Sequence, residues 1–81
     1  MLSDKMQAAL NKQINAEFFS SYLYLAMAAQ AEAKSLAGMA GWFRSQSQEE
    51  LVHGMKIYKY LNERGGRVNL DAIDKPKGEW A

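Results

Sequence analysis

The sequence predicts an all-α protein, an antiparallel hairpin of two long helices that forms half of a four-helix bundle. Three observations predict it. Residues 4–33 contain neither glycine nor proline, and strong helix formers dominate there. Apolar residues recur at alternating spacings of four and three along two stretches, as on the side of a helix that faces a partner. One short break separates the stretches, and a short connection makes long helices antiparallel neighbours.

The first helix is expected over about residues 4–33, with Ser3 as its N-cap. Residues 34–35 form the break, and Ser35 is expected to cap a second helix over about residues 36–64. Each helix is then about 45 Å long, at 1.5 Å per residue.

The second helix is expected to stop at Gly65 and Gly66, because glycine suits the left-handed position after a helix end. Residues 65–81 are expected to form an extended crossover on a surface, since Pro76 disfavours a helix interior. Three glycines lie within the second helix, and close approach of another helix is the expected reason for them: Gly38, Gly41 and Gly54.

Bulk composition narrows the function classes. The chain has 81 residues, a net charge of +1 and no cysteine, so disulfides, thiolate metal sites and thiol nucleophiles are excluded. The charge gives no reason to expect nucleic acid or an anionic membrane as a partner. The longest apolar run, residues 22–29, is much shorter than the roughly 20 residues of a membrane-spanning helix, and the N-terminus lacks the apolar core of a signal peptide. A cytoplasmic protein is expected.

Each of the two apolar stripes also contains polar or charged residues, which are unusual in a hydrophobic core. A carboxylate on the core side of a helix is costly unless something neutralises it, and a divalent metal ion is a candidate. The first stripe is Leu10, Ile14, Glu17, Ser21, Tyr24, Ala28 and Ala31, and the second is Met39, Phe43, Gln46, Glu50, His53, Ile57 and Tyr60.

The polar residues of the two stripes are expected to meet. Glu17 lies as many residues before the break near residue 35 as His53 lies after it, and Glu50 shares the face of His53 at a spacing of three. Carboxylates with one imidazole favour iron or manganese. Dinuclear sites in four-helix bundles use one Glu from each of two helices and one Glu-x-x-His from each of the others. This hairpin supplies half of that set, and two copies about a two-fold axis would supply all of it.

Each of these residues also has a purely structural interpretation. A Glu or His in a stripe commonly sets helix register or is a satisfied core residue. Tyr24 is either a core aromatic or a redox-active or ligand-orienting neighbour of the site. Glu49 points away from the stripe, and it is either solvated or an auxiliary iron ligand. Gln46 and Ser21 are interpreted as hydrogen-bond partners of the ligands.

The apolar side chains that flank the stripes make a surface too broad for a lone hairpin in water. Further helices are therefore expected, from another chain or from a continuation of this one. The flanking residues are Phe18, Phe19, Leu23, Leu25 and Met27, with Trp42, Leu51, Val52, Met55, Tyr58 and Leu61 on the second helix.

Four segments together resemble prokaryotic non-haem ferritins. Residues 9–28, ALNKQINAEFFSSYLYLAMA, are similar to the first helix of that family, and residues 41–55, GWFRSQSQEELVHGM, to its second helix. GGRVNL at 65–70 and KPKGEW at 75–80 resemble the long crossover that follows. The resemblance covers essentially the whole chain.

The resemblance implies that Glu17, Glu50 and His53 bind the first ferroxidase iron and that Glu50 bridges to the second. Tyr24 would be the tyrosine beside the site, and Glu49 a ligand of an accessory iron. Members of the family oxidise Fe(II) with O₂ at a dinuclear centre and store the ferric mineral in a cage of 24 four-helix subunits.

A ferritin subunit has further long helices that carry the remaining ligands of the second iron. The resemblance therefore predicts either the N-terminal part of a longer subunit or a half-subunit that assembles by two-fold pairing. No haem is expected, because Val52 stands where bacterioferritins place a haem-ligating Met.

The sequence thus favours an iron-storage ferroxidase that acts on Fe(II) and O₂ as a homo-oligomer. One rival is a rubrerythrin-like peroxidase, which the absence of cysteine disfavours. The other is a helical-hairpin assembly module, or an inactive fragment, in which Glu17 and His53 only set the register.

Overall fold

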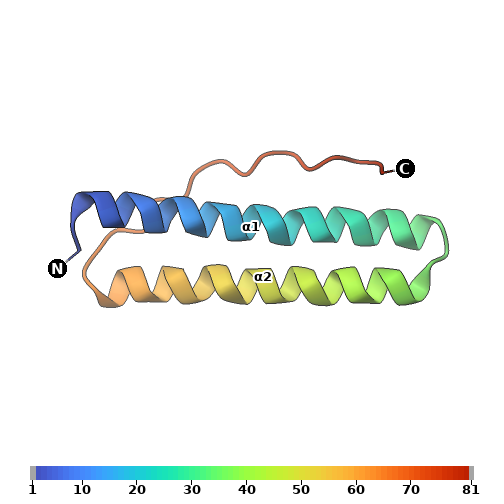
Figure 1. Cartoon of the computed structure of the whole chain (residues 1–81), viewed down its shortest axis with the longest axis horizontal. Helices are drawn as coiled ribbons and strands as arrows, with labels where there is room; N and C mark the ends of the chain where they lie inside the picture. The colour runs from blue at the N-terminus through green and yellow to red at the C-terminus, as the bar shows by residue number, and fades with distance from the viewer. Residues whose placement is uncertain (1, 81) are drawn as a thin grey trace.

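The computed structural model describes residues 2–80, which form two antiparallel helices and an extended tail. Helix α1 spans Asp4–Ala33 and α2 spans Ala37–Glu63. The chain after α2 crosses α1 and then returns along it, so the C-terminal end lies near the α1–α2 turn (Figure 1). The principal extents are 49 × 19 × 13 Å. The predicted all-α hairpin is confirmed, and none of the described helices is long and apolar enough to cross a membrane.

Helix α1 begins as the sequence predicts. Ser3 has an extended backbone, and its Oγ accepts a hydrogen bond from the Met6 N–H at 3.1 Å. Asp4 in the first turn lies against the positive end of the helix dipole. The cap and the charge together define the start of the helix.

The turn between the helices differs from the prediction at Ser35. Ser35 adopts a left-handed backbone with φ of 59°. Its N–H donates to the Glu32 carbonyl at 3.0 Å, and the Leu36 N–H donates to the Ala31 carbonyl at 2.8 Å. This Schellman pattern closes α1. The prediction that Ser35 caps the second helix is therefore wrong: Leu36 is the N-cap of α2, with no side-chain hydrogen bond.

Ser35→Gly is expected to raise the free energy of unfolding by about 0.5–1 kcal/mol, because a residue with a Cβ is strained at positive φ. The greater freedom of glycine in the unfolded chain offsets part of the gain. Urea unfolding measures the change. Ser45→Gly, at an exposed position within α2, is the control and should cost a few tenths of a kcal/mol. Equal destabilisation by both changes would contradict the account of this turn.

Helix α2 ends at the predicted glycines. Gly65 has φ of 75°, and its N–H donates to the Asn62 carbonyl at 3.2 Å. The Gly66 N–H donates to the Leu61 carbonyl at 2.9 Å. These bonds form a second Schellman motif, so the stop at Gly65 and Gly66 is confirmed.

On α2, the contact between the helices consists of three small residues and one leucine at a spacing of seven. This contact line lies one residue, about 100° around the helix, from part of the stripe that the sequence predicts. The predicted α2 stripe is therefore only partly covered by α1: Phe43 packs on Tyr24 of α1, whereas Met39 and Tyr60 are exposed. The buried residues of the contact are Ile14, Ala28 and Ala31 on α1, and Ala40, Ser47, Gly54 and Leu61 on α2.

Only one of the three helical glycines is explained by close approach within the hairpin. A Cβ built on Gly54 would lie 2.4 Å from Phe18 Cε1. The same construction at Gly38 meets nothing within 4 Å, and at Gly41 it meets only Arg44 Nη2 at 3.9 Å. The prediction is confirmed at Gly54, where the small residue lets α1 and α2 come together.

The hairpin leaves a large apolar surface uncovered, as its patterning predicts, although Leu61, which was expected on that surface, is fully buried. The exposed fractions of these large apolar side chains run from 42% to 63%. Their number is unusual for a small soluble protein and indicates a surface that another element covers. They are Met6, Tyr22, Leu25, Leu36, Met39, Trp42, Leu51, Val52, Met55, Tyr60, Leu70 and Ile73.

Residues 64–80 lie along α1 as the predicted surface segment, held by amide side chains. Asn11 both accepts from the Asn69 N–H at 2.7 Å and donates to the Arg67 carbonyl at 2.9 Å. Such amides supply the hydrogen bonds that an extended backbone otherwise lacks. Three further amides do the same: Gln7 to the Arg67 N–H, Asn15 to the Ala72 carbonyl, and Gln30 to both backbone groups of Trp80.

Candidate metal centre

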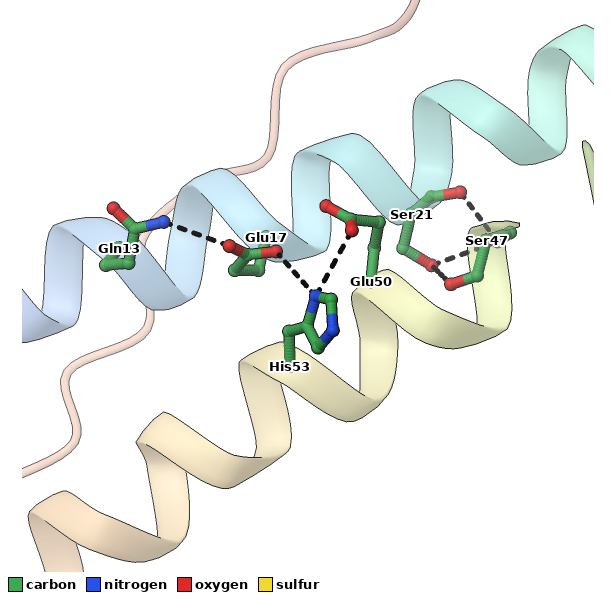
Figure 2. Close-up of polar contacts among 6 residues, drawn as sticks. All are labelled: Gln13, Glu17, Ser21, Ser47, Glu50 and His53. Atoms are coloured by element: carbon green, nitrogen blue, oxygen red, sulfur yellow. Dashed lines mark hydrogen bonds and ion pairs between the residues drawn. The ribbon is translucent and has the colours of Figure 1, made fainter. Parts of the chain in front are cut away.

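Glu17 from α1 converges with Glu50 and His53 from α2 near the middle of the hairpin (Figure 2). One ligand atom from each residue lies within 4.8 Å of the others. The equal distance of Glu17 and His53 from the turn places them at one height, and the spacing of three keeps Glu50 beside His53. The structure thus brings together the three ligands that the sequence singles out.

The imidazole lies between the two carboxylates. His53 Nδ1 is 3.2 Å from Glu50 Oε1 and 3.7 Å from Glu17 Oε2. The Glu17 and Glu50 side chains are 18% and 23% exposed, whereas that of His53 is 51% exposed. The group is therefore enclosed on the hairpin side and open on the other.

One carboxylate oxygen lacks a partner. Gln13 Nε2 donates to Glu17 Oε1 at 3.0 Å, but within residues 2–80 the buried Glu17 Oε2 has no hydrogen-bond partner. A buried anionic oxygen without a donor is costly, and a bound cation would remove that cost. Gln13 was not among the predicted site residues, although its spacing of four from Glu17 is a signal for such a contact.

The pKa of Glu50 is raised above the usual range of a glutamate. The largest cause is a hydrogen bond to the Glu17 carboxyl group, which the protonated form can make. Burial and repulsion from Glu17 act in the same direction, whereas His53 lowers the pKa. Two carboxyl groups held this close favour sharing a proton or a cation.

The raised pKa of Glu50 predicts that metal affinity and the stability of the metal-free protein change in opposite directions with pH. Metal binding needs the carboxylate, so affinity for Co(II) should fall on acidification at a higher pH than with an exposed glutamate. In the metal-free protein, the stabilisation from protonated Glu50 is present at low pH and is lost as the pH rises through the raised pKa. Co(II) titrations and urea unfolding between about pH 4 and 7 measure both trends. Glu50→Gln should abolish the pH dependence of stability in the metal-free protein. If that pH dependence persists in the variant, the assignment to Glu50 is contradicted.

Ser21 does not serve the ligands as predicted. Its Oγ donates to the Ser47 carbonyl at 2.8 Å and lies 3.0 Å from Ser47 Oγ, which in turn donates to the Ser21 carbonyl at 2.7 Å. The two serines thus join α1 to α2 (Figure 2). Gln46 is half-buried and shows no hydrogen bond to the ligands among the described contacts. The contact at Ser47 was not predicted. The signal in the sequence for this contact is the spacing of seven residues from Ala40 and from Gly54.

Tyr24 and Glu49 lie outside the group of three ligands. The Tyr24 ring stacks on Phe43 at 6.2 Å and meets the Trp42 ring edge-on at 6.4 Å. Among the described contacts none joins Tyr24 to a ligand, so its packing is that of a core aromatic. Glu49 is exposed on α2, where its carboxylate is free to bind an ion from solvent.

The fold and the site define a class of protein: a long-helix hairpin of bundle type with two carboxylates and a histidine at mid-length that could hold a metal ion. Comparison with known proteins identifies the family. A family model described as "Ferritin-like domain" matches residues 7–81. The chain belongs to the ferritin-like family, and the predicted resemblance to non-haem ferritins is confirmed.

Individual relatives and solved structures indicate the same family. The chain is 46% identical over 81 residues to a bacterial non-heme ferritin of Staphylococcus epidermidis and 44% identical to one of Staphylococcus aureus, covering 100% of this chain and 49% of each relative. A closed form of the Archaeoglobus fulgidus ferritin, engineered by mutagenesis, superposes with a TM-score of 0.97 at 51% identity, over 99% of this chain and 49% of that one. The open pore ferritin of the same archaeon gives 0.96, also at 51% identity, over 99% and 49%. The chain therefore spans about half the length of these relatives.

Proposed function

We propose that this chain takes part in iron storage as a ferroxidase, binding Fe(II) at Glu17, Glu50 and His53 and passing its electrons to O₂. The observation that carries the proposal is the convergence of these three side chains with a buried, unpartnered oxygen on Glu17. Membership of the ferritin-like family supports the same chemistry.

The ligand set suits the proposed substrate. Two carboxylates and an imidazole bind Fe(II) well, and the negative charge favours Fe(III) once it forms. Glu50 Oε1 is the oxygen that lies near His53 Nδ1, and its other oxygen is proposed to bridge to a second iron. Four Fe(II) ions each give one electron to reduce one O₂, while water supplies the remaining oxygen of the ferric oxyhydroxide and releases protons. Storage of that mineral requires a homo-oligomer, as a cage when the subunit is complete.

Metal-free protein loaded anaerobically with Fe(II) and then exposed to O₂ tests the proposal. Ferric absorbance should rise faster than in buffer alone, and His53→Ala should slow it at least about tenfold through lost iron affinity. Glu63→Gln removes an exposed carboxylate at the end of α2 and is the matched control. Equal rates with and without His53 would refute the proposal. Glu49→Gln tests the accessory ligand and should change only iron bound beyond the first site.

Tyr24 is proposed to assist electron transfer beside the site, and its hydroxyl can be removed alone. Tyr24→Phe keeps the ring that packs on Trp42 and Phe43. We expect oxidation to slow several-fold while Fe(II) affinity and the urea midpoint stay unchanged. Stopped-flow absorbance and anaerobic Fe(II) titration measure the two. A rate equal to that of the unmodified chain would leave Tyr24 as a core aromatic only.

A further inference from the structure

The serine clamp is the pair of Ser21 on α1 and Ser47 on α2, in which each hydroxyl donates a hydrogen bond to the backbone carbonyl of the other residue. We propose that the serine clamp is a positioning element of the metal centre. It fixes the separation between Glu17 on α1 and the Glu50 and His53 pair on α2, and thereby favours smaller divalent ions over larger ones. The identity of the ion as iron rests on the proposed function, whereas the positioning rests on contacts between α1 and α2.

The serine clamp lies about one helical turn from the ligands, on the same faces of the two helices. Ser21 follows Glu17 by four residues, and Ser47 precedes Glu50 by three. Along the helix axes these spacings are about 6 Å and about 4.5 Å, at 1.5 Å per residue. Figure 2 shows both serines beside the ligand group. Because a helix without a kink curves only gently over one turn, the separation of the helices at the clamp determines their separation at the ligands.

The hydrogen bonds of the serine clamp join one backbone to the other through very short side chains. Ser21 Oγ lies 2.8 Å from the Ser47 carbonyl oxygen, and Ser47 Oγ lies 2.7 Å from the Ser21 carbonyl oxygen. A serine side chain has one rotatable carbon–carbon bond, so the helices cannot separate without losing these bonds. Ser47 is only 7% exposed, so loss of the bonds would leave a buried hydroxyl without a partner. The clamp therefore opposes separation of the helices.

Packing alone does not account for the hydroxyl of Ser47. The other buried residues on the same line of α2 are Ala40, Gly54 and Leu61, which carry no polar side-chain atom. Alanine in place of Ser47 would be a better helix former and would bury no hydroxyl. The hydroxyl occurs one turn from Glu50, where it holds the helices together beside the ligands.

A second contact limits how closely the helices approach. Phe18 follows Glu17 directly, and Gly54 follows His53 directly. A Cβ built on Gly54 would overlap the Phe18 ring, so this ring packs against the backbone of α2. The ligands lie between the Phe18 contact and the serine clamp. The first contact prevents closer approach and the second prevents separation, so the gap between the ligands is held from both directions.

The gap matters because ligands from two helices must reach the same ion. Oxygen ligands lie about 2.0–2.2 Å from Zn(II) and about 2.3–2.6 Å from Ca(II), so the fit depends on the size of the ion. Sites with nitrogen and oxygen ligands generally bind Co(II) more tightly than Mn(II), the larger of the two ions. A gap that cannot widen increases this preference. Loss of the serine clamp should therefore reduce it.

Ser47→Ala tests the clamp when metal-free protein is titrated with Co(II) and with Mn(II). We expect Co(II) affinity to fall about tenfold and Mn(II) affinity to fall less. The visible absorption spectrum of bound Co(II), which reports ligand geometry, should change as well. Ser21→Ala should act in the same direction, and it serves if circular dichroism shows that Ser47→Ala does not fold. Ser21→Thr keeps the hydroxyl and should retain the affinities and the spectrum of the unmodified protein.

Two controls separate positioning from stability. Ser45→Ala makes the same change at an exposed position of α2, and it should alter neither the affinities nor the spectrum. Ala40→Gly loosens the buried contact line two turns from the clamp. It should lower the urea midpoint but leave the Co(II) spectrum and the ratio of Co(II) to Mn(II) affinity unchanged. If Ser47→Ala behaves as Ala40→Gly does, the serines only stabilise the hairpin and the proposal is overturned.

The separation of the helices can also be measured without metal. Because the chain has no cysteine, Ala16→Cys with Val52→Cys, at two exposed positions, places one spin label on each helix beside the ligands. Ser47→Ala should lengthen or broaden the label distances measured by pulsed electron paramagnetic resonance, and Ser45→Ala should not. Unchanged distances would overturn the clamp. Changed distances in a protein that binds no Co(II) even when unmodified would support the positioning and count against the proposed function.

Discussion

Gly54→Ala is expected to lower the free energy of unfolding by about 1–2 kcal/mol, although alanine is the better helix former. The new Cβ would lie 2.4 Å from Phe18 Cε1 and 2.7 Å from Phe18 Cδ1, which no real contact tolerates. The ring must move or the helices must separate, and such overpacking typically costs 1–3 kcal/mol. The gain in helix propensity, about 1 kcal/mol, offsets only part of it. Urea unfolding measures the net change.

The matched control for Gly54→Ala is Gly41→Ala in the same helix. A Cβ at Gly41 meets only Arg44 Nη2, at an ordinary 3.9 Å, so this change should stabilise by about 0.5–1 kcal/mol. The opposite signs isolate the contact with Phe18. Phe18→Leu should reduce the cost of Gly54→Ala in a double-mutant cycle. Gly54 follows His53 directly, so separating the helices there should also weaken Co(II) binding. Stabilisation by both alanines would show that α1 and α2 are farther apart than in this structure.

Glu17→Gln is expected to have the second large effect, with opposite signs on metal binding and on stability. The amide keeps an oxygen that can accept from Gln13 Nε2 as Glu17 Oε1 does. It also replaces the unpartnered Oε2 with a donor that can face Glu50, and it removes the repulsion between the two carboxylates. The metal-free protein should gain about 1 kcal/mol, whereas metal affinity should fall more than about 100-fold with the loss of a charged ligand.

Co(II) titration and urea unfolding of metal-free protein separate the two effects of Glu17→Gln. Glu63→Gln should change neither quantity, since Glu63 is exposed at the end of α2. The two measurements on Glu17→Gln also decide whether Glu17 is a metal ligand or a residue that only sets the helix register. A register role predicts that Glu17→Gln leaves Co(II) affinity unchanged and destabilises the hairpin. Opposite signs are the mark of a functional site that the fold holds at a cost in stability.

The sequence alone determined those features that depend on neighbouring residues. Ser3 and Gly65 define helix ends because the N-cap hydroxyl and the left-handed glycine act within one turn. Glu17, Glu50 and His53 could be matched in height by counting from the turn, because an α-helix has a constant rise per residue. For the same reason the existence of a ligand group could be predicted without coordinates.

The tertiary structure alone decided which face of α2 meets α1. Two faces with the same period differ by one residue, and periodicity does not distinguish them. Close packing chose the line through Ala40, Ser47 and Gly54, since small residues let two backbones approach. The ligand-bearing face was thereby left partly uncovered, with the His53 side chain 51% exposed. Ser35 likewise had to accept a left-handed backbone to close the turn, and the amides Asn11 and Asn15 acquired partners more than fifty residues away. Each of these outcomes depends on long-range contacts, which local propensity and spacing do not encode.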